Sequence, residues 1–137
     1  MAGYSSTPLV KKLGLKAGQR VALVNAPADF SVTLGALPAD VEIVRQLRAP
    51  LDLILCFVTS ESELIKRFAP LAAKLAPAGG LWIAWPKKAA RVTTDLHEGV
   101  VRGVGLEAGL VDNKVCAIDD VWSGLRFVIR LRDRKSR

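Results

Sequence analysis

The stretch LDLILCFVTSESELIKRFAPLAAKLAPAGGLWIAWP, residues 51–86, has the pattern of a strand, a helix and a second strand. Residues 53–58 are apolar without alternation, as expected for a strand that is covered on both faces. Ser60 and Glu63 form a capping-box pattern, and apolar residues then recur at helical spacing until a second apolar run begins at Leu81. Two strands joined by a helix in this way are expected to be parallel, with a right-handed crossover.

The segments on either side extend this unit. Residues 20–25 form another apolar run, and residues 41–44 form a shorter, alternating one. A helix capped by Thr93 or Thr94 is expected to reach about Ala108. Two further strands, within residues 110–119 and 125–132, predict an antiparallel hairpin. We therefore expect a three-layer, Rossmann-like α/β domain with a mainly parallel sheet of about six strands and this hairpin at its C-terminal end.

Length and hydropathy indicate one domain. With 137 residues, half of them apolar, the chain can form a single core, which we assign to residues 1–132, followed by a basic tail at residues 133–137. No apolar run reaches the length of a membrane span, and the N-terminus lacks a signal pattern. We expect a soluble, cytoplasmic protein that does not bind membranes.

The residues that usually ligate metals are scarce. His97 is the only histidine, which excludes a site with two histidines from one chain, so no metal is expected. Cys56 and Cys116 lie within apolar runs and have no CxxC spacing. We expect both to be buried, reduced thiols.

Positive charge is concentrated at the C-terminal end. Residues 126–137 contain six basic residues against one acidic residue, so this segment carries +5 of the net charge of +7. A basic strand and tail of this kind can bind nucleic acid or another anion in a salt-dependent way. The chain lacks the alternation of aromatic and basic residues found in single-strand binders, which favours a solvated end instead.

The expected topology predicts a ligand site. In an open parallel sheet, ligands bind beyond the carboxyl ends of the strands. Polar or aromatic residues that follow three of the expected strands would meet at that edge: Asn25, Pro27, Asp29, Thr59, Ser60, Trp85, Lys87 and Lys88. Thr59, Ser60 and the adjacent helix start would offer hydroxyl and free N–H groups to an anion, and Trp85 could stack on a planar ring. The alternative is that Ser60 only caps its helix and Trp85 only packs. We expect a small anionic ligand or a protein partner.

The order of elements resembles that of a shortened class I S-adenosylmethionine (SAM)-dependent methyltransferase. LKAGQRV at residues 15–21 resembles the start of that family's first strand, LDLIL at 51–55 its fourth strand, and LAPAGGLWI at 75–83 the approach to its fifth. The whole chain also resembles a family of small bacterial proteins known only as a domain of unknown function. The segments that carry this second resemblance are YSSTPL at 4–9, LWIAWPK at 81–87 and WSGLRFV at 122–128. The resemblance to this second family implies no activity.

The chain departs from the methyltransferase pattern at the cofactor. The family follows its first strand with a Gly-x-Gly loop, because glycine allows the backbone to approach the ligand closely. This chain has NAPAD at residues 25–29. The family also places an acid after its second strand to hold the ribose hydroxyls, whereas here Arg45 follows Val44. Only residues 45–50 separate the second strand from the central strand, so we expect a strand and a helix of the longer enzymes to be missing.

These departures lead us to expect a non-catalytic binding or regulatory module that is not an enzyme and has no cofactor. The first alternative is a SAM-dependent methyltransferase with an altered cofactor loop, in which Asn25 or Asp29 makes a ligand contact. The second is a nucleic-acid or anion binder that uses the basic C-terminal strand and tail.

Overall fold

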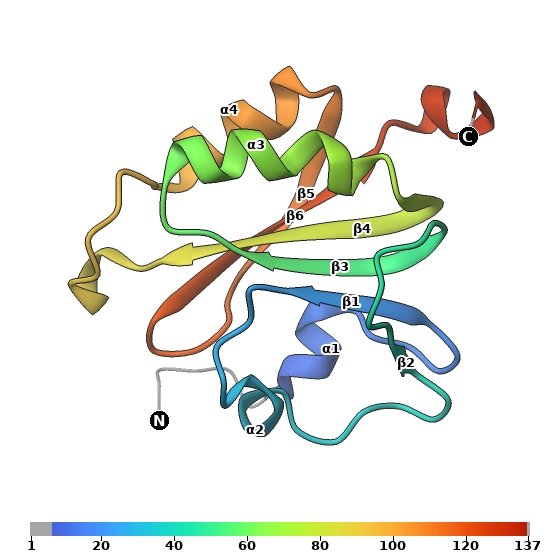
Figure 1. Ribbon diagram of the computed structural model, residues 1–137, viewed down its shortest axis with the longest axis horizontal. Helices are drawn as coiled ribbons and strands as arrows, with labels where there is room; N and C mark the ends of the chain where they lie inside the picture. Colours follow the sequence, from blue (N-terminus) through green and yellow to red (C-terminus); the bar gives the residue numbers. More distant parts are fainter. Residues whose placement is uncertain (1–6, 137) are drawn as a thin grey trace.

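The computed structural model describes residues 7–136 and contains one six-stranded sheet with helices on both faces (Figure 1). The strands are β1 (Arg20–Val24), β2 (Glu42–Ile43), β3 (Leu51–Phe57), β4 (Leu75–Pro86), β5 (Leu110–Ala117) and β6 (Trp122–Ile129), in the order β2-β1-β3-β4-β6-β5. The first four strands are parallel, and β6 runs antiparallel to both β4 and β5. The predicted Rossmann-like α/β class and the C-terminal hairpin are confirmed.

Two pairs of helices cover the sheet. Figure 1 shows α3 (Glu61–Ala72) and α4 (Glu98–Glu107) on one face, and α1 (Leu9–Leu13) and α2 (Phe30–Leu34) on the other. Two short 3-10 helices, η1 (Lys88–Ala90) and η2 (Leu131–Ser136), follow β4 and β6. No helix within residues 7–136 is long and apolar enough to cross a membrane.

Both faces of strand β3 are covered, which explains why apolar and polar residues do not alternate in its sequence. Leu53, Leu55 and Phe57 pack in the core under α1 and α2. The intervening residues, such as Ile54 and Cys56, pack in the core under α3 and α4. Both faces of the strand are therefore buried, and each face takes every second residue.

Strand β4 begins at Leu75 rather than at the predicted Leu81, and α3 ends at Ala72. Gly79 and Gly80 lie within β4 and serve strand pairing. A Cβ built on Gly79 would lie 2.8 Å from the carbonyl oxygen of Leu51, so only glycine lets the strands approach at this point. The register between β3 and β4 shifts here. The sequence alone did not show whether β4 begins before or after the pair Gly79 and Gly80.

Helix α4 begins at Glu98, not at Thr93 or Thr94. One glycine of α4 allows the helix to approach the sheet closely. The structure assigns this role to Gly105, where a Cβ would overlap the ring of Phe127. Gly103 has open space in the direction of a Cβ.

Candidate functional site

The chain leaves β1 through a residue in the left-handed conformation. Asn25 has a φ of 57°, which glycine adopts freely and asparagine tolerates better than most residues. Its side-chain amide donates a hydrogen bond to Oε2 of Glu63 over 3.3 Å. The carbonyl of Pro27 accepts from the N–H of Phe30, and Asp29 is exposed and makes no side-chain capping bond to α2. Asn25 therefore gives this loop the backbone turn of a glycine.

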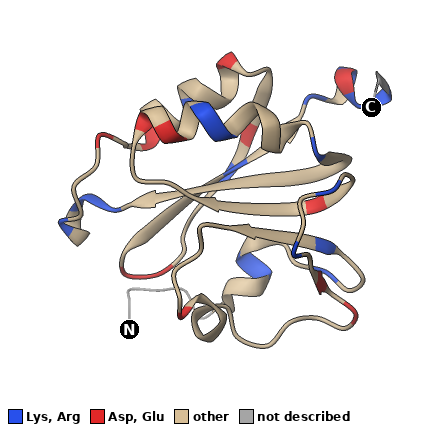
Figure 2. Ribbon diagram, in the orientation of Figure 1, with Lys and Arg blue, Asp and Glu red and all other residues tan. Residues whose placement is uncertain are grey.

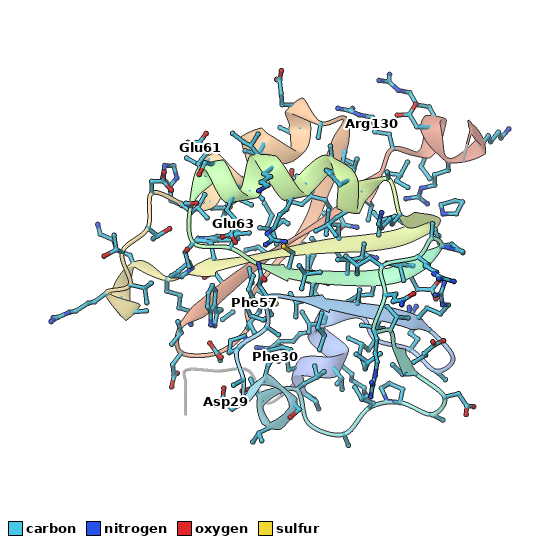
Figure 3. All side chains as sticks on the ribbon, viewed as in Figure 1. Asp29, Phe30, Phe57, Glu61, Glu63 and Arg130 are labelled. Carbon is cyan, nitrogen blue, oxygen red and sulfur yellow. The ribbon has the colours of Figure 1, made fainter. Side chains whose placement is uncertain are left out.

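Glu63, in the first turn of α3, connects the ends of β1 and β3. One carboxylate oxygen accepts from Asn25, and the other accepts from the N–H of Thr59 over 3.2 Å. The N–H of Glu63 donates to Oγ of Ser60 over 3.2 Å, so the predicted cap at Ser60 is confirmed. Figure 3 shows Glu63 at the start of α3. The sequence pattern assigned Glu63 to the helix cap alone, because nothing in it points to Asn25.

The loop before α4 lies over the end of β3. Oγ1 of Thr94 donates to the carbonyl of Thr59 over 2.6 Å and accepts from the N–H of Leu96. Oδ1 of Asp95 accepts from the N–H of Glu61 over 2.8 Å. Thr94 thus fixes a loop to β3 rather than capping a helix. Sequence reasoning missed the contribution of Asp95, which is 34 residues away from the group it binds.

Two of the N–H groups at the start of α3 that we expected to be free for an anion donate to side chains instead. The N–H of Glu61 bonds to Asp95, and that of Glu63 bonds to Ser60. Figure 2 shows acidic residues at this end of the helix. Glu63 forms an ion pair with Arg67 over 3.4 Å. The carboxylates of Glu61 and Asp95 disfavour an anion here and favour a positively charged group.

Two cavities border the carboxyl ends of β3 and β4. One, of about 410 Å³, lies over Thr59 and Ser60, and the other, of about 400 Å³, is lined by Trp85, Lys87 and further residues that include Lys88, His97 and Ser123. Thr94 lines both. Trp85 is only 5% exposed and packs in the core, so it forms a wall of its cavity. That its ring stacks on a ligand stays a prediction.

Aromatic side chains fill the space under the loop after β1. Phe30 and Phe57 are each 2% exposed, with ring centroids 5.0 Å apart, and Phe57 makes a second edge contact with Trp122 at 5.0 Å. Figure 3 shows Phe30 and Phe57 between α2 and the end of β3. A ligand next to Asn25 must therefore lie over the exposed loops and cannot enter beneath them.

The predicted site residues form two groups. Glu63 links Asn25 to Thr59, whose neighbour Ser60 shares its cavity, and Trp85 and Lys87 line the adjoining one. Asn25, Pro27 and Asp29 belong to the same edge of the sheet but line neither of these two cavities.

The two cysteines differ from each other. Cys56 is fully buried in β3, and burial raises the pKa of its thiol to about 12. Cys116 is only half-buried, because β5 is the outer strand of the sheet. The prediction of a buried thiol is confirmed for Cys56 and wrong for Cys116. Within residues 7–136, no group of three or more His, Cys, Asp or Glu side chains is placed to hold a metal ion.

Comparison with known proteins gives matches among solved structures alone. No protein-family model and no curated protein matches the chain. The resemblance to a small bacterial family therefore stays a prediction, and residues 4–6 of its first motif lie outside the described residues.

Methyltransferases are among the similar solved structures. Magnesium protoporphyrin IX methyltransferase (ChlM) from Synechocystis PCC 6803 with bound SAM has a TM-score of 0.58 and 14% identity, over 88% of this chain and 74% of that chain. A SAM-dependent methyltransferase from Aquifex aeolicus has a TM-score of 0.58 and 19% identity, over 87% and 86% of the two chains. A methyltransferase from Pyrococcus furiosus has a TM-score of 0.59 and 12% identity, over 87% and 78%.

This likeness overturns our leading expectation of a non-catalytic module that is not an enzyme and has no cofactor. Methyltransferases share this fold, and some of those structures contain bound SAM. It favours the alternative of a SAM-dependent methyltransferase with an altered cofactor loop. The chain has the fold of a shortened class I SAM-dependent methyltransferase.

Proposed function

We propose that this chain is a SAM-dependent methyltransferase in which SAM binds at the carboxyl edge of the sheet, beside Asn25, Asp29 and Thr59. The observation that carries the proposal is the strand order around β1, which lies between β2 and β3 so that the order reverses beside it. Open α/β sheets bind ligands at such a switch point. The SAM bound to ChlM supports the choice of ligand.

The loop after β1 meets the requirement for close backbone approach without a glycine. Asn25 adopts the left-handed turn, and Ala26, Pro27 and Ala28 have small side chains in a loop that is exposed or half-buried. A ligand would therefore meet the turn that glycine gives, with small side chains beside the backbone.

The charges at this edge suit the cofactor, which carries its reactive methyl group on a cationic sulfur. Glu63 pairs with Arg67 over 3.4 Å, so the acidic character at the end of β3 comes from Glu61 and Asp95, which stabilise a nearby cation. Arg45 is exposed after β2 and cannot replace the missing acid. We assign the contact with the ribose hydroxyls to Asp29, the exposed carboxylate of the loop after β1.

Each remaining part of the edge has a role in this proposal. Glu63 holds the two loops in fixed positions through Asn25 and Thr59. The cavity lined by Trp85, Lys87 and His97 provides room for the methyl acceptor next to the cofactor. The buried Trp85 limits the access of water from the core side.

Isothermal titration calorimetry with SAM and with S-adenosylhomocysteine (SAH) tests the proposal. Asn25→Gly keeps the left-handed turn and should bind within a few-fold of the unmodified chain. Asn25→Val disfavours that turn and should weaken binding at least about tenfold. Asp40 is the matched control, since its φ is 60° and it lies before β2, outside the site. Asp40→Val should lose stability but keep its affinity. Absence of binding by the unmodified chain at millimolar SAM and SAH would refute the proposal.

A further inference from the structure

A cavity lies at the opposite edge of the parallel strands. It has a volume of about 420 Å³, within the range of small-molecule sites. Its walls come from the end of α1 and the turn that follows, from the first residues of β3 and β4, and from β5 and β6. Because β1, β3 and β4 are parallel, their amino ends meet here, away from the site proposed for SAM.

Four cations line this amino-edge cavity, namely Lys12, Lys16, Lys114 and Arg126, against the single carboxylate of Asp52. None of the ion pairs within residues 7–136 involves any of the four. Lys114 donates to the carbonyl of Lys12 over 2.8 Å, and Lys12 donates to the carbonyl of Ala117 over 3.3 Å. These bonds orient the ammonium groups without neutralising them. The cavity therefore retains a positive charge.

Arg126 is held in place by the sheet. It lies in β6 between β4 and β5, opposite Trp82 on one side and Lys114 on the other. A Cβ built on Gly80 would overlap its guanidinium, so the glycine makes room for the charged group. Burial, assisted by Arg134, lowers the pKa of Arg126. A partly desolvated cation without a carboxylate partner is costly unless an anion completes it.

We propose that the amino-edge cavity binds a small molecule through a phosphoryl group, with Arg126 as its anchor. Arginine presents a planar fork of donors that matches phosphate oxygens, and lysines add charge around it. Apolar groups such as Leu13, Leu53 and Ala76 contribute the rest of the wall, which suits a ligand with an organic part beyond the phosphoryl group. This site is separate from the cofactor site, so failure of one proposal would not affect the other.

Calorimetry with inorganic pyrophosphate at low ionic strength tests the proposal. We expect saturable one-to-one binding that Arg126→Gln weakens at least about tenfold and that Lys16→Gln and Lys114→Gln each weaken several-fold. Arg130→Gln and Lys66→Gln are the matched controls, because they remove the same charge outside the cavity. Equal weakening by the controls would show nonspecific attraction and overturn the site. A lack of pyrophosphate binding to the unmodified chain would also overturn the site.

A second measurement locates the ligand and covers the case in which Arg126→Gln fails to fold. Pyrophosphate should shift the amide NMR signals of Gly14, Ala78 and Asn113, which line the cavity, and leave those of Asn25 and Thr59 in place. Shifts at Asn25 and Thr59 alone would contradict the proposal. Lys16 and Lys114 are exposed, so their variants should fold and decide the question. A single-stranded oligonucleotide that displaces pyrophosphate and depends on residues 132–137 would favour the nucleic-acid alternative instead.

Discussion

The two edges of the parallel sheet differ in charge and in the state of their polar groups. At the carboxyl edge, Asn25, Thr59 and Glu61 donate to side chains of the chain itself, and the acceptors are the carboxylates of Glu63 and Asp95. At the amino edge, four cations surround a cavity and make no ion pair among the described residues. The usual rule places ligands at the carboxyl edge. The charges add to this rule, because a cationic cofactor suits the carboxyl edge and an anion suits the amino edge.

The largest expected effect tests whether aromatic packing closes the carboxyl edge from below. Phe30→Ala removes a buried ring that contacts Phe57, and should lower the free energy of unfolding by about 3–5 kcal/mol in urea denaturation. Val32 lies in the same helix and is 82% exposed, so Val32→Ala should change stability by less than about 0.5 kcal/mol. Lys16→Ala, at the amino edge, should be equally mild. A small effect of Phe30→Ala would mean that this edge is loosely packed.

A smaller effect compares one carboxylate from each edge. Glu63→Gln leaves a single oxygen to serve the two donors on Asn25 and Thr59 and removes the ion pair with Arg67. It should cost about 1–2 kcal/mol in the same assay. Asp52 accepts one hydrogen bond, from the N–H of Arg20, which the oxygen of asparagine can also accept. Asp52→Asn should therefore leave stability nearly unchanged while strengthening pyrophosphate binding. The comparison fails if the two substitutions are equally destabilising.

A further effect depends on pH and concerns the thiols. An unfolded cysteine has a pKa near 8.5, and burial raises that of Cys56 to about 12, so the unfolded chain loses its proton first. The stabilisation from Cys56 is thus complete below about pH 8 and is lost as the pH rises toward 12. Unfolding free energies between pH 7 and pH 10 should fall more steeply for the unmodified chain than for Cys56→Val. Parallel curves would contradict this assignment.

Alkylation distinguishes the two thiols under native conditions. Burial raises the pKa of Cys116 as well, but Lys12 and Lys114 oppose that rise, and the residue is half-exposed. Iodoacetamide should therefore modify Cys116 before Cys56, and pyrophosphate should slow the reaction if it occupies the neighbouring cavity.

Local patterns were sufficient for the core elements. The strand at residues 53–58 and the C-terminal hairpin are visible in the sequence, because each buries apolar residues that are close together along the chain. The start of β4 is not visible in the sequence, since Gly79 is compatible with either a loop or close strand pairing. The close approach of the Leu51 carbonyl, which only the structure shows, identifies strand pairing.

The candidate sites depend on contacts that spacing cannot predict. The bond from Asn25 to Glu63 spans 38 residues. The left-handed turn of Asn25 is a property of its loop, whereas the sequence shows only a missing glycine. The amino-edge cavity escaped notice because its cations come from α1, the following turn, β5 and β6, and each alone is typical of a solvated surface. Arg126 was counted with the basic end, although β6 is an inner strand.

Amide NMR shifts on addition of SAH test the central claim most directly. If the cofactor binds at the carboxyl edge, the largest shifts should fall in residues 25–29 and 59–63, and residues 12–16 and 76–80 should stay unchanged. Shifts confined to the amino edge, or no shifts at saturating SAH, would contradict the account.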